Sequence, residues 1–198
     1  MYRYLLIFLI LVSGPAFSAC SVIPTIAGGP TITCGSATRY DVEVQSVSLC
    51  TESTCASPVS IGSTSKTFDI ASASVGSAIG SYANFDAVTP GTYTHVKTVV
   101  SSTMTLTGSA LATCGAVDAA QKTIPHTVTF PSNSMSLDWV TGSTSSLKMI
   151  IALSAPIVVS RTSSMPSISV KFGTSNALMC VGGVGSFPAP PDVSITVQ

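Results

Sequence analysis

Apolar and polar residues alternate with a period of two along several segments of the chain. This alternation is typical of β-strands that are buried on one face. The first such segment covers residues 40–49, and its apolar residues change phase midway. A change of phase within one strand needs an extra residue, so we expect a β-bulge near Gln45 and Ser46.

Further segments alternate in the same way, among them residues 66–70, 92–100, 168–172 and 193–197. In the second of these, strict alternation predicts Tyr93 and His95 on the same face of the strand. Residues 149–153 are apolar at every position, which is typical of a central strand covered on both faces. The alanine-rich residues 109–121 predict the one short helix.

The spacing of these segments indicates the fold class. Glycine, proline, serine and asparagine separate them at intervals of roughly 8 to 15 residues, as in an all-β domain with antiparallel strands. We therefore predict a single antiparallel β-sandwich over residues 20–198. Residues 187–191, Phe-Pro-Ala-Pro-Pro, predict a stiff tether that leads to a terminal strand at residues 192–198.

Residues 1–19 have the layout of a secretory signal peptide. A basic start at Arg3 precedes an apolar run at residues 5–12, which is too short to span a bilayer, and small residues follow. We expect export to the extracellular space, cell surface or periplasm, with no transmembrane helix in the mature chain. In an alternative, Cys20 carries a lipid anchor, but Phe17 is not the leucine-like residue expected three positions earlier, and acylation would leave an odd thiol.

Six cysteines suit a framework of three disulfides: Cys20, Cys34, Cys50, Cys55, Cys114 and Cys180. Cys50 and Cys55 lie close together after a predicted strand, so we expect a clip across a loop. Pairs Cys114–Cys180 and Cys20–Cys34 complete one of the 15 connectivities that six cysteines allow. The alternative, a metal site, lacks a C-x-x-C pair and has only two histidines to draw on, so we expect neither a metal nor a cofactor.

Charge argues against a polyanionic partner. Charged residues make up 8% of the chain, against roughly 25% in an average domain, and the formal net charge is +0. Without a basic surface the chain is not expected to bind nucleic acid. Its 33 serines and 24 threonines supply the polarity instead.

The sequence contains no motif that organises reactive side chains. It lacks G-x-S-x-G, H-E-x-x-H, a Walker loop and a dinucleotide-binding glycine motif, so we predict no enzymatic activity. A hydrolase would have to use one of the only two imidazoles, those of His95 and His126. A carbohydrate- or other ligand-binding module would use aromatic rings and an imidazole, for which the candidates are Tyr82, Phe85, Tyr93 and His95.

Residues 89–97 read Thr-Pro-Gly-Thr-Tyr-Thr-His-Val-Lys. This stretch resembles the Gly-Thr-Tyr-x-x-Ile/Val-Arg/Lys strand of a family of bacterial exported domains that has no established activity. Those domains are similar in having a strand that ends near Cys50 and a Phe-Asp-Ile-Ala-like stretch, as at residues 68–71. The resemblance covers residues 40–100 and implies a transthyretin-like or immunoglobulin-like β-sandwich.

Our leading functional hypothesis is a non-enzymatic, exported subunit of a surface, matrix or fibre. Low charge, a mean hydropathy of +0.55 and the disulfides favour chains that pack against neighbours. The terminal strand either completes its own sheet or pairs with the sheet edge of a neighbouring copy. The alternative function is an extracellular module that binds carbohydrate or another ligand.

Overall fold

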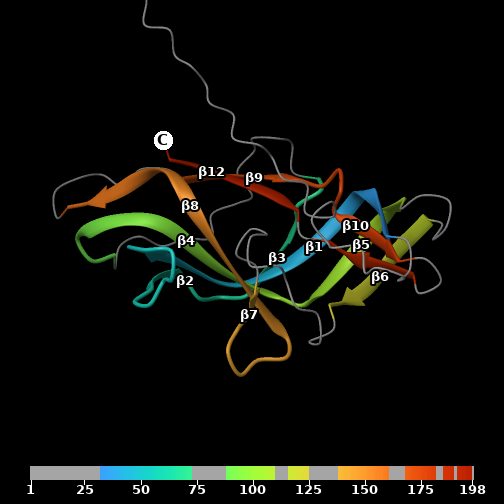
Figure 1. Ribbon diagram of the computed structural model, residues 1–198, viewed down its shortest axis with the longest axis horizontal. Helices are drawn as coiled ribbons and strands as arrows, with labels where there is room; N and C mark the ends of the chain where they lie inside the picture. The colour runs from blue at the N-terminus through green and yellow to red at the C-terminus, as the bar shows by residue number, and fades with distance from the viewer. Residues whose placement is uncertain are drawn as a thin grey trace, which may run out of the picture.

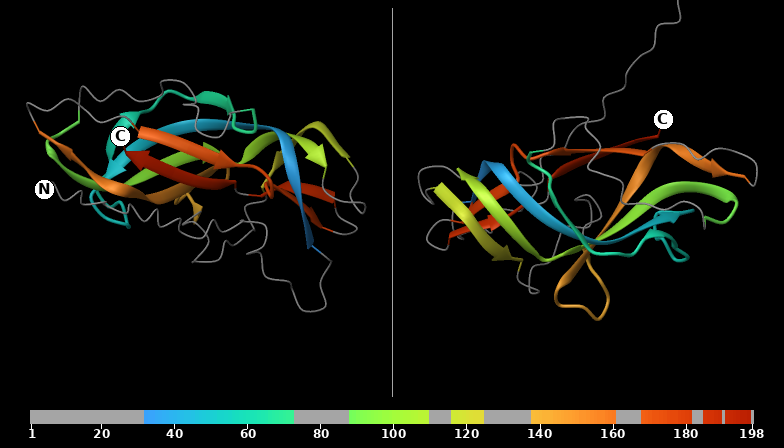
Figure 2. Two further views of the ribbon diagram at one scale, coloured as in Figure 1. Left: turned by 90° about the horizontal axis from the view of Figure 1, so that it is seen from above. Right: turned by 180° about the vertical axis from the view of Figure 1, so that it is seen from behind.

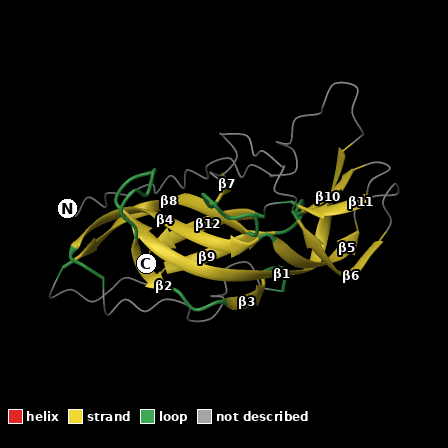
Figure 3. Ribbon diagram, turned by 90° about the horizontal axis from the view of Figure 1, so that it is seen from below, coloured by secondary structure: helices red, strands yellow, loops and turns green. Residues whose placement is uncertain are grey.

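The computed structural model describes residues 32–72, 88–109, 116–124, 138–160, 168–181, 185–189 and 191–197 (Figure 1). The signal peptide lies outside these ranges, as do Cys20, Tyr82, Phe85, Cys114 and His126. The described residues form strands and loops, with no helix among them (Figure 3). The strands are β1 (Ile32–Cys50), β2 (Val59–Gly62), β3 (Lys66–Asp69), β4 (Gly91–Ser101), β5 (Thr103–Ser109), β6 (Ala116–Thr123), β7 (Asp138–Trp139), β8 (Ser146–Val159), β9 (Ile168–Gly173), β10 (Leu178–Val181), β11 (Gly185–Pro188) and β12 (Asp192–Val197).

The long strand β1 is the centre of a ten-stranded antiparallel sheet. Along one edge it pairs with β5 and then β4, and along the other with β10, β3 and β2. β4 continues outward to β8 and β7, β5 to β6, and β10 to β11. β11 also contacts β6, so the sheet curls until strands from its two sides meet.

The two remaining strands, β9 and β12, form a separate antiparallel ribbon. The ribbon runs across the sheet along the top of Figure 1, and Figure 2 shows it from above. β12 contacts β8, although no backbone pairing joins these two strands among the described residues.

Two clusters of buried side chains lie along β1. The first cluster surrounds Tyr40 and Leu106 near the start of the strand, and the second surrounds Leu49 and Val96 near its end. Val193 of the ribbon packs against both clusters. The ribbon therefore covers the junction between the two halves of the core.

A bulge in β1 explains how one strand serves both clusters. The pairing with β4 shifts register between Val44 and Ser46, at the predicted position, which confirms the bulge expected there. Val42 then faces the first cluster and Leu49 the second. Burial on both sides of the slip fixes the register of each half, because a shift by one residue would turn its apolar side chains to solvent.

An irregularity in the pairing of β4 with β8 overturns the predicted face of His95, and its extra residues lie on β8, between Ala152 and Ile157. The pairing with β8 shifts register between Tyr93 and His95. Tyr93 is 2% exposed in the second cluster with Val96, whereas His95 pairs with Cys50 and Ala152 and is half-buried. Tyr93 and His95 therefore do not share a face, and strict alternation gave the wrong phase for the first part of this strand.

Three other predictions need correction. Residues 116–121 belong to strand β6 and not to a helix, because pairing with β5 outweighs the local helix propensity of the alanines. β8 is not covered on both faces at residues 149–153, since Ala152 is exposed. The predicted tether is shorter than residues 187–191, because Phe187 and Pro188 belong to β11 and pair with β10.

At the level of fold class the prediction is confirmed: the described chain is all-β and antiparallel, with a disulfide between Cys50 and Cys55. Its ten-stranded curled sheet with a two-stranded ribbon does not by itself establish a sandwich. No helix among the described residues has the length and hydropathy that a membrane-spanning segment needs.

Candidate functional site

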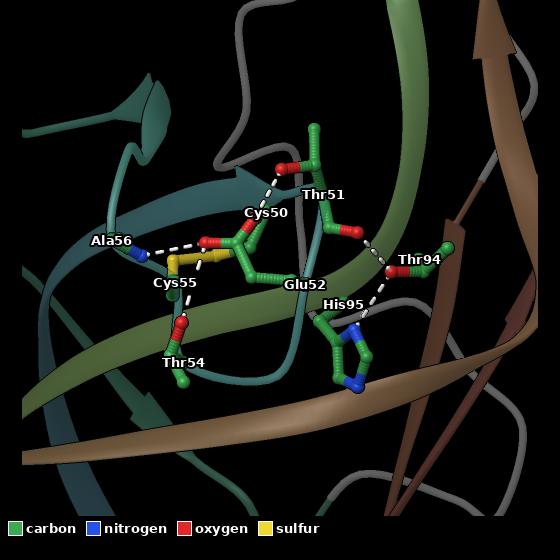
Figure 4. The surroundings of a disulfide bond; sticks show 8 residues. All are labelled: Cys50, Thr51, Glu52, Thr54, Cys55, Ala56, Thr94 and His95. Atoms are coloured by element: carbon green, nitrogen blue, oxygen red, sulfur yellow. Dashed lines mark hydrogen bonds between the residues drawn. A yellow bond between two sulfur atoms is a disulfide. The ribbon is translucent and has the colours of Figure 1, made fainter.

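A network of polar contacts lies where β1 ends, in the loop closed by Cys50 and Cys55 (Figure 4). The Cα atoms of the two cysteines are 5.0 Å apart, which confirms the predicted clip. The Cys55 N–H donates to the Glu52 carbonyl at 3.1 Å, and Cys55 itself has a left-handed backbone with a φ of 51°. A turn and a disulfide thus fold the chain back after β1.

The Glu52 carboxylate organises this loop from within. It accepts hydrogen bonds from the Thr51 hydroxyl, from the Ala56 N–H at 2.7 Å and from the Thr54 hydroxyl at 3.5 Å. The bonds from Thr51 and Ala56 hold the pKa of Glu52 below its usual value, because they stabilise the ionised form. The carboxylate oxygens of Glu52 therefore accept hydrogen bonds from residues of its own loop.

Thr94 of β4 connects this loop to His95. The Thr94 hydroxyl donates to the Thr51 carbonyl at 2.8 Å and lies 2.8 Å from His95 Nδ1 (Figure 4). Since the hydroxyl proton is used at the carbonyl, Thr94 Oγ1 accepts from the imidazole N–H. Neutral His95 is thereby held in the Nδ1–H form, with Nε2 as an acceptor.

None of the described residues donates to or accepts from His95 Nε2. Among the described residues no group of three His, Cys, Asp or Glu side chains could hold a metal ion. The hydrogen bond from Thr94 to the Thr51 carbonyl joins β4 to the disulfide loop at the end of β1.

Of the predicted ligand-binding residues, only Tyr93 and His95 lie in described parts of the chain. The Tyr93 hydroxyl donates to the Thr89 carbonyl at 2.7 Å, and its ring is buried. It therefore cannot stack on an external sugar, which corrects its proposed role. His95 is half-buried beside the disulfide loop, and no other exposed aromatic ring joins it there among the residues drawn in Figure 4.

The predicted cysteine framework is met in part by the described residues. Cys34 and Cys180 are both disulfide-bonded. Cys180 is fully buried in the first cluster, whereas Cys34 is half-buried. The proposed partners Cys20 and Cys114 lie outside the described residues, so those two pairings stay predictions.

The terminal strand forms the second notable site. Residues of β12 pair antiparallel with β9, from Asp192 opposite Gly173 to Val197 opposite Ile168. Within one chain, therefore, this strand pairs with its own β9. Val193 lies opposite Phe172, and both pack on the first core cluster.

The chain just before β12 is held firmly by its backbone. The Ala189 N–H donates to the Ala177 carbonyl at 2.8 Å, and the Ala189 carbonyl accepts from the Tyr40 hydroxyl at 3.0 Å. Both Ala189 and Tyr40 are fully buried. Met104 Sδ also lies 3.0 Å from the Tyr40 oxygen, but the carbonyl is the stronger acceptor.

Sequence reasoning missed this Tyr40–Ala189 contact. A tyrosine in phase with buried valines indicates a hydroxyl that needs a buried partner. The partner, however, is 149 residues away along the chain, and no local pattern marks it.

Comparison with known proteins adds no relative. The chain matches no protein-family model, no curated protein and no solved structure. The resemblance of residues 89–97 to exported bacterial domains therefore stays an expectation.

Proposed function

We propose that the chain is a non-enzymatic, exported subunit of a surface, matrix or fibre, which associates with copies of itself through its β-strands. The observation that carries this proposal is the terminal strand β12. Its backbone pairs only with β9 among the described strands, yet its Val193 packs on both halves of the core. β12 thus covers part of the core of the main sheet, although no described backbone pairing joins β12 to that sheet.

Such an element favours association between copies. A terminal strand that fills a site in its own subunit can fill the identical site in a neighbour, at low energetic cost. The charge balance supports this, since a chain with few charges and a formal net charge of +0 has little self-repulsion to keep copies apart. Export and an oxidising compartment fit the disulfide-bonded state of Cys34, Cys50, Cys55 and Cys180.

The finer fold proposal, a transthyretin-like or immunoglobulin-like sandwich, rests on two features. The ribbon faces the sheet across buried side chains, which is the arrangement of a second layer. The Tyr93 hydroxyl bonds back to the carbonyl of Thr89, as in the tyrosine corner of immunoglobulin-like domains.

Light scattering coupled to size-exclusion chromatography tests the function. Protein exported into an oxidising compartment and measured over a wide concentration range is expected to form oligomers that grow with concentration. A folded monomer at every concentration would contradict the proposal. Saturable binding on a glycan array by that monomer would support the ligand-binding alternative.

A further inference from the structure

The place occupied by β12 is defined on three sides. β9 pairs with it over six residues, and β8 lies beside it (Figures 1 and 2). Its Val193 packs against both core clusters. All of these contacts come from elements that precede residue 190. A second copy of this chain therefore offers the same site to any β12 that reaches it.

The chain that leads into β12 is bonded to its own subunit up to Ala189. Pro188 pairs with Leu178, and both backbone groups of Ala189 are bonded within the subunit. The chain is therefore anchored up to Ala189 wherever β12 goes. In the sequence, only Pro190 and Pro191 separate this anchor from Asp192.

We propose that β12 exchanges between copies of this chain, leaving its own site and filling the β9–β8 site of a neighbour, with Pro190 and Pro191 as the hinge. This inference rests on the proposed function and specifies its contact. The exchanged strand makes the same pairings and the same core contact as the closed one, so the two states differ mainly in the hinge and in the entropy of association. Exchange in one direction around an open series of copies gives a fibre, and reciprocal exchange gives a dimer.

The length of the hinge tests the exchange in the full chain. Deleting Pro190 and Pro191 shortens the connection by up to about 7 Å, so β12 can no longer reach its own β9 from the anchored Ala189. Inserting four Gly and Ser residues after Pro191 instead lets β12 close on its own subunit with ease. We expect association constants at least about a hundredfold apart, highest for the deletion and lowest for the insertion, with the natural chain between them.

Two matched substitutions identify the strand responsible. Val193→Asp in the deletion variant places a carboxylate between the two core clusters and should abolish its oligomers. Val158→Asp makes the same change at a valine that is 63% exposed on β8, and should leave those oligomers intact. Fluorescence of Trp139, the single tryptophan, which packs on the first cluster, reports whether each variant is folded.

The outcomes separate this inference from the proposed function. If the natural chain and both hinge variants assemble equally, strand exchange is wrong while self-association stands. If the natural chain and a folded deletion variant both stay monomeric, both proposals are wrong. If the deletion variant does not fold, the insertion variant tests the exchange by itself. Strand exchange requires the insertion variant to assemble more weakly than the natural chain, and equal assembly of the two would contradict it.

Discussion

Two buried tyrosines illustrate how much a single hydroxyl contributes. The Tyr40 hydroxyl bonds to the carbonyl of fully buried Ala189, whereas the Tyr93 hydroxyl bonds to exposed Thr89. Tyr40→Phe leaves a buried carbonyl without a partner, so we expect it to lower the free energy of unfolding by about 1–3 kcal/mol. Tyr93→Phe leaves a carbonyl that water can reach and should cost less. Urea unfolding of both variants measures the difference, and equal losses would contradict this account.

The Glu52 carboxylate gives the protein a defined response to acid. Its pKa is lowered in the folded state, so its stabilisation is present above the pKa of the unfolded state and is lost as pH falls through the folded-state pKa. Glu52→Gln should therefore be less stable than the natural chain near about pH 6 and equally stable near about pH 2. Thermal unfolding across this range measures the gap.

Thr51→Val is the matched control for that experiment. It keeps the Glu52 charge and removes the hydroxyl that lowers its pKa most. Its stability should fall less with acid than that of the natural chain, but more than that of Glu52→Gln. A Glu52→Gln variant with the same pH dependence as the natural chain would show that the loop does not depend on the ionised carboxylate.

At the scale of elements, the close approach of β5 to β1 and β10 depends on Gly108. A Cβ atom there would lie 2.3 Å from the Ser36 carbonyl oxygen and 2.6 Å from Leu178 Cδ1. Gly108→Ala must move backbone, so we expect a loss of at least about 1–3 kcal/mol in the free energy of unfolding. Gly91→Ala is the control, because its Cβ would lie at an ordinary 3.6 Å from the Tyr93 ring. Denaturant midpoints of both variants test this, and a tolerated Gly108→Ala would refute the close approach.

How much of these elements could be predicted depends on whether the determining contact is local. The bulge in β1 was predictable because its phase slip is visible in the sequence. The irregularity between β4 and β8 was not, since Tyr93 and His95 alternate normally in the sequence and the change of face appears only in the pairing with β8. β6 was mistaken for a helix for the same reason, because its partner β5 outweighs local preference.

In the candidate site, too, local contacts could be predicted from the sequence and distant ones could not. The clip between Cys50 and Cys55 was predictable from five residues of sequence separation. The bond from Tyr40 to Ala189, which anchors the chain before β12, joins opposite ends of the sequence and left no local pattern to find.

At the scale of the whole molecule, strand register restricts the disulfide framework. Once Cys50 and Cys55 are paired, four cysteines allow three connectivities. In the β1–β10 pairing Cys34 lies opposite Met179, while Cys180 lies opposite Thr33. Residues directly opposite share a face and neighbours along a strand alternate, so the side chains of Cys34 and Cys180 point to opposite faces of the sheet. These two cysteines therefore do not bond to each other.

The two connectivities that remain both place Cys20 and Cys114 in disulfides. We expect a peptide map under non-reducing conditions to join Cys34 and Cys180 to these two cysteines, in the predicted pairs Cys20–Cys34 and Cys114–Cys180. Intact mass should then show six oxidised cysteines and no acyl group on Cys20, because a cysteine in a disulfide cannot also carry a thioether-linked lipid. The same protein after reduction is the control for the oxidised mass. A peptide that joins Cys34 to Cys180, or an acyl group on Cys20, would overturn the framework, and the acyl group would make the protein membrane-anchored.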